Sequence, residues 1–214
     1  MKWPSIKEMG SLVPLPPGYS LGRLTPDNIA TLIAAIKRWH PDIAVGVASC
    51  YMREDFYLNR AYFEDQTERD ILVILLMFNG EMVGMWSFER ELEALALYGR
   101  ILIIAPEHRG AKLSTYLLKG TDQLGRWMGA AFMYAMATLK IPNVQRALET
   151  AGYRLLGFFP GYNREEVAPG VVKRVYEAVY AKLLVPENEV LRPDPKNLTP
   201  NSKVLFELLF AEDV

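Results

Sequence analysis

The stretch Ile101–Leu118, ILIIAPEHRGAKLSTYLL, decides the fold of this 214-residue chain. Its first four residues are branched and apolar, as in a buried β-strand, and Ala105-Pro106 ends the run. A short polar turn with one glycine follows, and leucines at helical spacing then predict an amphipathic helix. The first N–H groups of such a helix have no partners within it, and they suit a phosphate group. The stretch therefore predicts an anion site where a strand leads into a helix.

Composition excludes several classes of protein. Hydrophobic residues make up 50% of the chain and charged residues 23%, as in an ordinary globular protein, and a net charge of -1 argues against a nucleic-acid partner. Cys50 is the only cysteine and the chain has two histidines, so we expect no intrachain disulfide and no metal site. Residues 1–8 do not have the pattern of a signal peptide, and the longest uncharged stretch, Trp127–Leu139, is shorter than the roughly 20 residues of a membrane span. We expect a cytoplasmic protein without a membrane partner.

Hydrophobic periodicity predicts an α+β fold with α/β/α layers. A mixed, mostly antiparallel central sheet of about seven strands is expected over residues 19–24, 70–78, 82–90, 94–104, 130–137, 153–159 and 172–184. Helices are expected over residues 25–39, 50–60, 111–128, 142–152 and 200–210. Asn79-Gly80 is a strong hairpin signal between the second and third strands, because both residue types tolerate positive φ.

The predicted domain organisation has three parts. Residues 1–18 form an N-terminal extension, residues 19–185 the folded domain, and residues 186–214 a proline-rich tail with a final helix. Apolar residues mark the expected buried side of three helices: Leu113, Leu117, Leu124 and Trp127; Val144, Ala147 and Leu148; and Val204, Leu205, Leu208 and Leu209. The tail helix needs a surface to cover, either on its own domain or on a partner subunit, and we expect a homodimer.

Two motifs resemble those of the GNAT superfamily of acetyl-CoA-dependent N-acetyltransferases, and the predicted order of strands and helices is similar to that of this superfamily. The first is the turn after Ile104, where the family pattern is Arg or Gln, two residues, Gly, one residue, then Gly or Ala. Arg109 takes the first place, whereas Lys112 and Ser114 stand at the two later positions. The second motif, NVQRALETAGY over Asn143–Tyr153, is similar to the family's helix that begins with asparagine and leads through glycine into a strand. The resemblance implies the acyl-CoA N-acyltransferase type of fold.

The resemblance also implies how acetyl-CoA would bind. Backbone N–H groups from Gly110 to Thr115 would hold the pyrophosphate, and Leu102 and Ile104 would pair with the pantetheine arm as an added strand. Arg109 and Lys112 could add charged contacts to phosphate, and the N–H of Leu102 would be the oxyanion donor. The complete predicted cofactor-binding set is Leu102, Ile104, Arg109, Gly110, Ala111, Lys112, Leu113, Ser114, Thr115 and Asn143.

The proton-transfer groups depart from the family pattern. Tyr98 stands where many members carry a glutamate, and Leu148, which cannot donate a proton, stands where many carry a tyrosine acid. Tyr98 is therefore the candidate acid toward the departing thiolate, and Glu89, Glu93 or a chain of waters could accept the amine proton. Aromatic residues are candidates for the wall of the acceptor pocket: Tyr51, Trp86 and Tyr134.

Three functions remain open at this point. The first is direct transfer of an acetyl group from acetyl-CoA to a primary amine of a small molecule or peptide. The second is a non-catalytic acyl-CoA-binding or interaction protein on the same fold, as the residues at positions 98 and 148 suggest. The third, acyl or aminoacyl transfer to tRNA, draws no support from the near-neutral charge.

Overall fold

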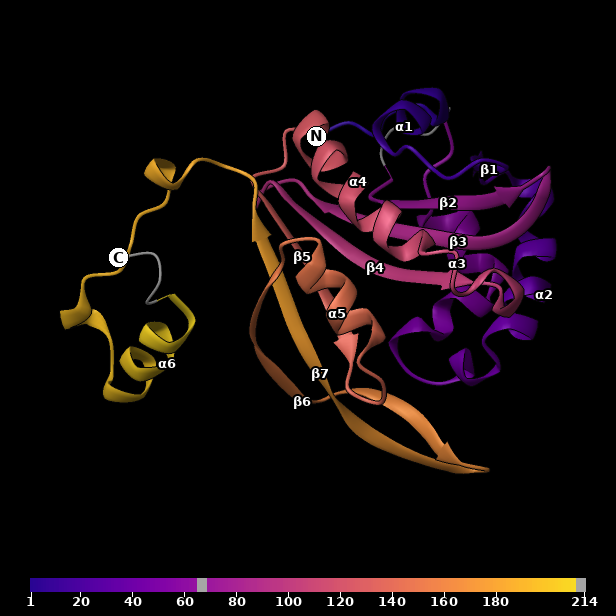
Figure 1. Ribbon diagram of the computed structural model, residues 1–214. Helices are drawn as coiled ribbons and strands as arrows, with labels where there is room; N and C mark the ends of the chain where they lie inside the picture. The colour runs from indigo at the N-terminus through magenta and orange to yellow at the C-terminus, as the bar shows by residue number, and fades with distance from the viewer. Residues whose placement is uncertain (65–68, 211–214) are drawn as a thin grey trace. The chain divides into compact units, whose positions relative to one another are not determined.

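The computed structural model describes residues 1–64 and 69–210, and the chain divides into two compact units, Met1–Leu184 and Val185–Val214. The first unit contains one seven-stranded sheet of order β1-β2-β3-β4-β5-β7-β6, in which only β4 and β5 are parallel (Figure 1). The strands are β1 Tyr19–Arg23, β2 Ile71–Phe78, β3 Glu81–Glu91, β4 Ala96–Ile104, β5 Phe132–Thr138, β6 Arg154–Ala168 and β7 Val171–Leu183. The helices of this unit are α1 Ile6–Leu12, α2 Ile29–Trp39, α3 Glu54–Arg60, α4 Leu113–Met128 and α5 Asn143–Thr150, with short 3-10 turns η1 Pro26–Asn28, η2 Pro41–Ala44, η3 Val47–Met52 and η4 Pro106–His108. The predicted mixed sheet with flanking helices is confirmed.

The β2–β3 hairpin turns where the sequence predicts. Asn79 and Gly80 have φ angles of 48° and 88°, in the left-handed region that this tight turn requires. β2 is buried along most of its length, which explains why its sequence is an almost unbroken apolar run.

α4 covers one face of the sheet with small and apolar residues. Leu113, Leu117 and Leu124 are buried as predicted, but Trp127 is 44% exposed. The prediction for Trp127 was wrong because the buried stripe also contains Gly120, Thr121, Gly125 and Met128, which places its centre away from Trp127. Val144 of α5 is likewise exposed rather than buried, and only Leu148 of that helix is fully enclosed.

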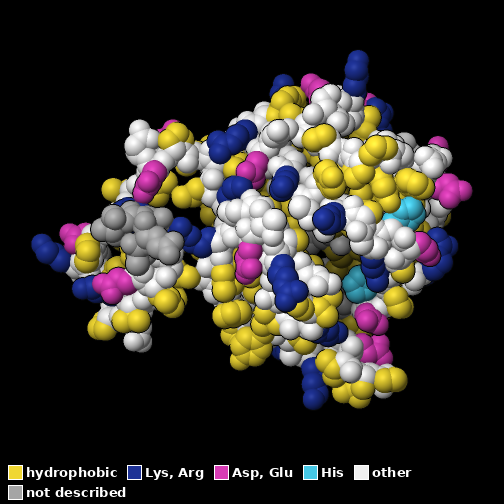
Figure 2. Space-filling model, in the orientation of Figure 1, with side chains coloured by type: hydrophobic (Ala, Val, Ile, Leu, Met, Phe, Trp, Pro, Cys, Tyr) yellow, Lys and Arg dark blue, Asp and Glu magenta, His cyan; other side chains and the backbone are white. Residues whose placement is uncertain are grey.

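Two further segments differ from the prediction. Residues 50–60 do not form one helix, because Arg53 has an extended backbone and separates η3 from α3. β6 continues past the predicted strand end at Phe159 as far as Ala168 and forms a long hairpin with β7. Their register is irregular at three places, and the one between Phe159 and Asn163 contains Pro160 and Gly161, since proline is tolerated at a bulge. Hydrophobic side chains gather at the tip of this hairpin, where Val171 and Val172 are exposed, whereas Lys and Arg side chains lie scattered among Asp and Glu side chains elsewhere on this face (Figure 2).

The N-terminal residues, for which the sequence predicts no element, contain the short helix α1. Ser5 and Glu8 form a capping box that starts it, with the Ser5 side chain accepting from the N–H of Glu8 and the Glu8 carboxylate accepting from the N–H of Ser5. Met9 and Val13 are buried, and a side chain on Gly120 of α4 would come within 2.7 Å of Val13. α1 is therefore packed into the same core as α4.

Within the described residues, no helix is both long and apolar enough to span a bilayer. The second unit contains η5 Glu187–Glu189, η6 Pro195–Asn197 and the helix α6 Pro200–Phe210. α6 forms where the sequence predicts it, and Val204, Leu205 and Leu208 on it are 67%, 49% and 78% exposed.

The packing of α1 predicts that its core residue contributes to the stability of the whole first unit. Met9→Ala should lower the free energy of unfolding by about 2–5 kcal/mol, because it leaves a cavity beneath α1. Gly10→Ala is the matched control: its new methyl group meets open space, and in a helix it should stabilise by about 0.5–1 kcal/mol. Urea denaturation measures both variants, and an unchanged midpoint for Met9→Ala would show that α1 is not part of the cooperative core.

Candidate active site

The candidate site begins where β4 and β5 diverge. The two strands are paired only from Ala96 to Gly99 and from Phe132 to Ala135. Beyond these residues β4 remains paired with β3, and β5 remains paired with β7. The side of β4 that faces away from β3 is therefore left without a strand partner from Arg100 to Ile104.

The alternation of hydrogen bonds along β4 shows which backbone groups face the gap. The N–H of Ala105 donates to the carbonyl of Val83 on the β3 side at 2.8 Å. In an antiparallel pair every second residue bonds its partner, so Ile103 also faces β3, and Leu102 and Ile104 point their N–H and C=O groups the other way. Two of the predicted cofactor-binding residues thus present backbone groups to the opening between β4 and β5.

A row of free amides lies next to this opening. Among the described residues, the N–H groups of Gly110, Ala111, Lys112, Leu113 and Ser114 have no hydrogen-bond partner, whereas the N–H groups of Thr115 and Tyr116 bond back to the carbonyl of Lys112. Gly110 has φ 101° and Lys112 has φ 55°, and such turns can direct successive N–H groups to one side. The loop and the first turn of α4 therefore present free backbone N–H groups, which are the kind of group that suits an anion.

Arg109 connects this loop to the end of β4 and to the end of α2. Its Nε donates to the carbonyl of Ile104 at 3.1 Å, and its Nη2 donates to the carbonyl of Trp39 at 3.0 Å. The guanidinium group thus satisfies the free carbonyl at the end of β4 and connects the loop to the end of α2. Lys112, at the start of α4, is exposed and forms no ion pair within the described part of the chain.

Two stacked tyrosine rings, Tyr98 and Tyr134, form what we call the tyrosine floor of the site, on the face of the sheet opposite α4. Met133 lies next to Gly125 of α4, so its neighbour Tyr134 points to the other face of the sheet. There Tyr134 stacks on Tyr98, with ring centroids 4.7 Å apart, and its hydroxyl donates to Glu91. Burial, followed by the neighbouring Tyr162, raises the pKa of Tyr98 above its ordinary range. Tyr98 therefore holds its proton at neutral pH, and its hydroxyl has no hydrogen-bond partner among the described residues.

A charged network lies beside this floor. Arg100 sits opposite the register shift in β3, and its guanidinium forms an ion pair with Glu89 and a 3.1 Å hydrogen bond to the hydroxyl of Tyr51. The Tyr51 hydroxyl donates to Ser87 at 2.7 Å, and burial raises the pKa of Tyr51 to about 12. Glu89 also lies 3.7 Å from Arg60, so its negative charge is matched by two arginines.

Besides Glu89, the structure has a buried carboxylate that was not predicted as a site residue from the sequence, Glu177 of β7. It is 8% exposed, and its Oε1 accepts a 2.9 Å hydrogen bond from the Nδ2 of Asn163 on β6. Asn163 also accepts a 3.0 Å hydrogen bond from the N–H of Val47, so it connects the β6–β7 hairpin to η3. Gly46 makes this contact possible, because its φ is 89° and a side chain there would lie 2.2 Å from the carbonyl of Arg164. The adjacent Gly-Val-Ala sequence offered no signal for such a contact, since its partner is 116 residues away.

The other predicted residues lie in different surroundings. Tyr51 and Trp86 are 1% and 2% exposed, so of the three aromatic candidates only Tyr134 is half-buried at the site. Asn143 is exposed at the start of α5, and Leu148 is enclosed in the core. The described residues bring together no group of three side chains that could hold a metal ion.

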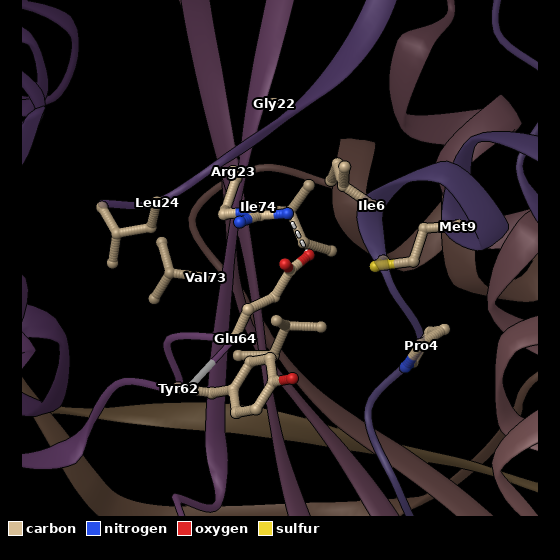
Figure 3. Close-up of a pocket in the computed structure, with 11 residues that line it drawn as sticks. Pro4, Ile6, Met9, Gly22, Arg23, Leu24, Tyr62, Glu64, Val73 and Ile74 are labelled. Atoms are coloured by element: carbon tan, nitrogen blue, oxygen red, sulfur yellow. Dashed lines mark ion pairs between the residues drawn. The ribbon is translucent and has the colours of Figure 1, made fainter. Parts of the chain in front are cut away.

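A separate shallow pocket lies between α1 and the β1–β2 edge (Figure 3). Its lining is mainly apolar, and one side is closed by an ion pair between Arg23 and Glu64. The carboxylate in its described lining, Glu64, is held in that ion pair, so we place the candidate site at the β4–β5 opening instead.

The left-handed conformation of Lys112 predicts a stability difference. Lys112→Gly should stabilise the protein relative to Lys112→Ala by about 1 kcal/mol, because only glycine adopts this conformation without a steric cost. Both variants remove the same charge, so chemical denaturation of the pair isolates the backbone contribution. Equal stability of the two variants would show that the loop does not hold Lys112 in this conformation.

No family model matches the sequence, and no curated protein matches it in a sequence search. Solved structures are similar at the level of fold. A ribosomal L7/L12 alpha-N-protein acetyltransferase, RimL, in complex with coenzyme A has a TM-score of 0.62 at 10% identity, over 80% of this chain and 97% of that one. A spermidine N-acetyltransferase, SpeG, from Vibrio cholerae has a TM-score of 0.61 at 12% identity, over 78% and 94%.

A third similar structure is the microcin C7 self immunity acetyltransferase MccE in complex with acetyl-CoA and AMP. It has a TM-score of 0.59 at 13% identity, over 78% of this chain and 93% of that one. The shared architecture includes the sheet and its flanking helices, and it agrees with the resemblance that the two sequence motifs indicate. The chain has the acyl-CoA N-acyltransferase fold of the GNAT superfamily.

Proposed function

We propose that this chain is an acetyl-CoA-dependent N-acetyltransferase that transfers an acetyl group directly to a primary amine of a small molecule or peptide. One observation carries the proposal: five consecutive backbone N–H groups, from Gly110 to Ser114, have no partner in the described structure and lie beside an open strand edge. Unpaired amides at a helix N-terminus favour a negatively charged group. The open edge provides N–H and C=O groups for an extended, amide-containing chain.

Each part of the site has a task in this function. The N–H groups of Gly110–Ser114 would hold the pyrophosphate, while Leu102 and Ile104 would direct the pantetheine arm. Because Arg109 already occupies the carbonyl of Ile104, the N–H of Ile104 is the group left for pairing at that residue. When bound, acetyl-CoA supplies the activated acyl group.

The N–H of Leu102 would stabilise the negative charge that develops on the thioester oxygen. Tyr98 would then donate its proton to the departing sulfur, since its phenol is protonated at neutral pH. The similar solved structures include acetyltransferases for a protein and for spermidine, which supports an amine as the acceptor class.

Thermal unfolding with added acetyl-CoA, together with thiol release across a panel of primary amines, tests this function. The panel contains a polyamine, a peptide with a free N-terminus and an arylalkylamine. A rise in melting temperature with release of thiol supports an enzyme, whereas a rise without release for any amine supports the alternative, a non-catalytic acyl-CoA-binding protein. No rise at millimolar acetyl-CoA would exclude both functions.

The helix N-terminus predicts opposite effects of one substitution on stability and on binding. Ser114→Glu should leave the unliganded protein as stable or raise its stability by about 0.3–1 kcal/mol, because a negative charge favours the first turn of a helix. The same charge repels a pyrophosphate, so the affinity for acetyl-CoA should fall at least about tenfold, which corresponds to about 1.4 kcal/mol. Ser114→Gln is the uncharged control of the same shape, and calorimetric titration of both variants makes the comparison. Equal affinities would place the pyrophosphate elsewhere.

We also propose that the second unit makes a homodimer contact through α6. Val204, Leu205 and Leu208 expose apolar side chains on this helix, and such surfaces are usually covered by a partner. Ending the chain after Pro186 should halve the mass measured by light scattering. Leu208→Glu, in the full chain, should have the same effect with no loss of the first unit's stability, and an unchanged mass in both cases would remove the proposal.

A further inference from the structure

The proposed function leaves one step without a residue, the removal of a proton from the acceptor amine. An amine attacks a thioester only as the neutral base, so a group at the site must take the proton that it loses on forming the amide. Glu89 is held between Arg100 and Arg60, and its charge is already matched by these two ion pairs. Glu93 is exposed in the turn between β3 and β4, away from the β4–β5 opening.

The register of the sheet places Glu177 beside the β4–β5 opening. Gly99 of β4 pairs with Ala135 of β5 at the last point where the strands are joined. β5 stays paired with β7 beyond this point, and Thr138, three residues past Ala135, pairs with Glu177. Leu102, the proposed oxyanion donor, also lies beyond the last pair, on β4. Glu177 is therefore on the β7 side of the opening and Leu102 on the β4 side.

Glu177 also lies on the correct face. Side chains four residues apart on a strand share a face, so Thr138 and its partner Glu177 share the face of Tyr134 and Tyr98. The charge of Glu177 is near enough to Tyr98 to raise the pKa of that hydroxyl. Only one of its carboxylate oxygens is bonded, to Asn163, and the other has no partner among the described residues.

We propose that Glu177 is the general base that accepts the proton of the acceptor amine, and that Asn163 is a positioning residue that orients it. This assignment rests on the proposed function. In the step, the amine nitrogen forms a bond to the acyl carbon, the carbon–sulfur bond breaks, Tyr98 gives its proton to the sulfur, and a carboxylate oxygen of Glu177 takes a proton from the nitrogen. Asn163 fixes the carboxylate through its Nδ2 and is itself fixed by the N–H groups of Val47 and Arg164.

The surroundings of Glu177 make it a stronger base than an exposed carboxylate. Burial raises the pKa of its carboxyl group, the hydrogen bond from Asn163 opposes this rise, and the nearby Glu165 adds to it. Glu165 forms an ion pair with Lys140, and further charged or titratable groups near the site include Arg100, Tyr98, Tyr134 and Tyr162. A carboxylate with raised proton affinity accepts a proton more readily than an exposed one.

Glu177→Gln tests the base, because glutamine keeps the shape and can still accept from Asn163. The value of kcat for thiol release, measured with the best acceptor of the amine panel, should fall at least about 100-fold, while the rise in melting temperature with acetyl-CoA stays unchanged. The acid limb of the pH–rate profile should disappear. Glu166→Gln, on the same hairpin near its turn, is the matched control and should retain full activity.

Asn163→Ala distinguishes a positioning role of Asn163 from a purely structural role. Losing the hydrogen bond that lowers the pKa of Glu177 should move the acid limb of the pH–rate profile to higher pH. A purely structural role would lower the amount of folded protein without moving this limb. Asn163→Ser retains a short hydroxyl donor and should shift the limb less than alanine does.

Stability provides a readout that does not need turnover. The folded protein binds a proton at Glu177 more tightly than the unfolded chain does, so the wild type should lose stability as pH rises from the ordinary carboxyl range through the raised pKa. Glu177→Gln lacks this loss, and its melting temperature relative to wild type should rise over the same pH interval.

Four results overturn the assignment. Unchanged kcat and pH profile in Glu177→Gln, with wild-type binding and turnover intact, would reject Glu177 as the base and leave the transferase function standing. An acid limb that stays in place in Asn163→Ala would reject the positioning role. A melting-temperature difference that falls with rising pH would contradict the raised proton affinity of the carboxylate. A wild-type protein that neither binds acetyl-CoA nor releases thiol would reject both the function and its base.

Discussion

The separation of β4 from β5 is the constraint on which the rest of this structure depends. Parallel strands that stay paired satisfy all their backbone groups, and here the pairing ends at Gly99 and Ala135. Each strand then depends on its outer neighbour, β3 for β4 and β7 for β5. The cost of the exposed edge is reduced at one point by Arg109, which bonds the carbonyl of Ile104 and, through Trp39, connects the edge to α2. An arginine that the family resemblance assigns to phosphate therefore also holds the edge in shape, and its side chain contributes to the site whether or not it touches a ligand.

The long β6–β7 hairpin is a second constraint on the site, because it carries both Asn163 and Glu177. Asn163 anchors it to the segment at Gly46 and Val47, two parts of the chain that the sequence separates widely. The contact is close: no residue with a side chain fits at Gly46 without displacing the carbonyl of Arg164. The hairpin and η3 are thus fixed to each other at the side chain that also holds Glu177. Rigid backbone contacts of this kind position a carboxylate better than a flexible surface loop does.

The mixed sheet and the turn that leads into α4 can be predicted from the sequence, because they follow from local patterns: apolar runs, Asn79-Gly80, and a strand that leads directly into a helix. The sequence prediction missed α1, although Ser5 and Glu8 have the spacing of a capping box, since seven residues are too few for a periodicity signal. It also stopped β6 at Phe159, because bulges interrupt the alternation on which strand prediction depends. Glu177 could not be found this way. Its burial and its bond to Asn163 arise from pairing between β6 and β7, whereas in the sequence it is one carboxylate in an ordinary alternating strand.

Leu148 and Tyr98 stand at the acid and base positions of the family pattern, and each suits its surroundings in this fold. Leu148 lies on the buried side of α5, is 1% exposed, and belongs to the same core as Tyr153 and Ala151. A leucine there gains stability from burial that a phenol would partly lose. Tyr98 is enclosed by Tyr134 and retains its proton, so it cannot accept one but can donate one. The chain lacks the family's glutamate at position 98 and its tyrosine at position 148. In the proposed function the acid, Tyr98, lies on β4, and the proposed base, Glu177, is the buried carboxylate of β7 on the other side of the opening.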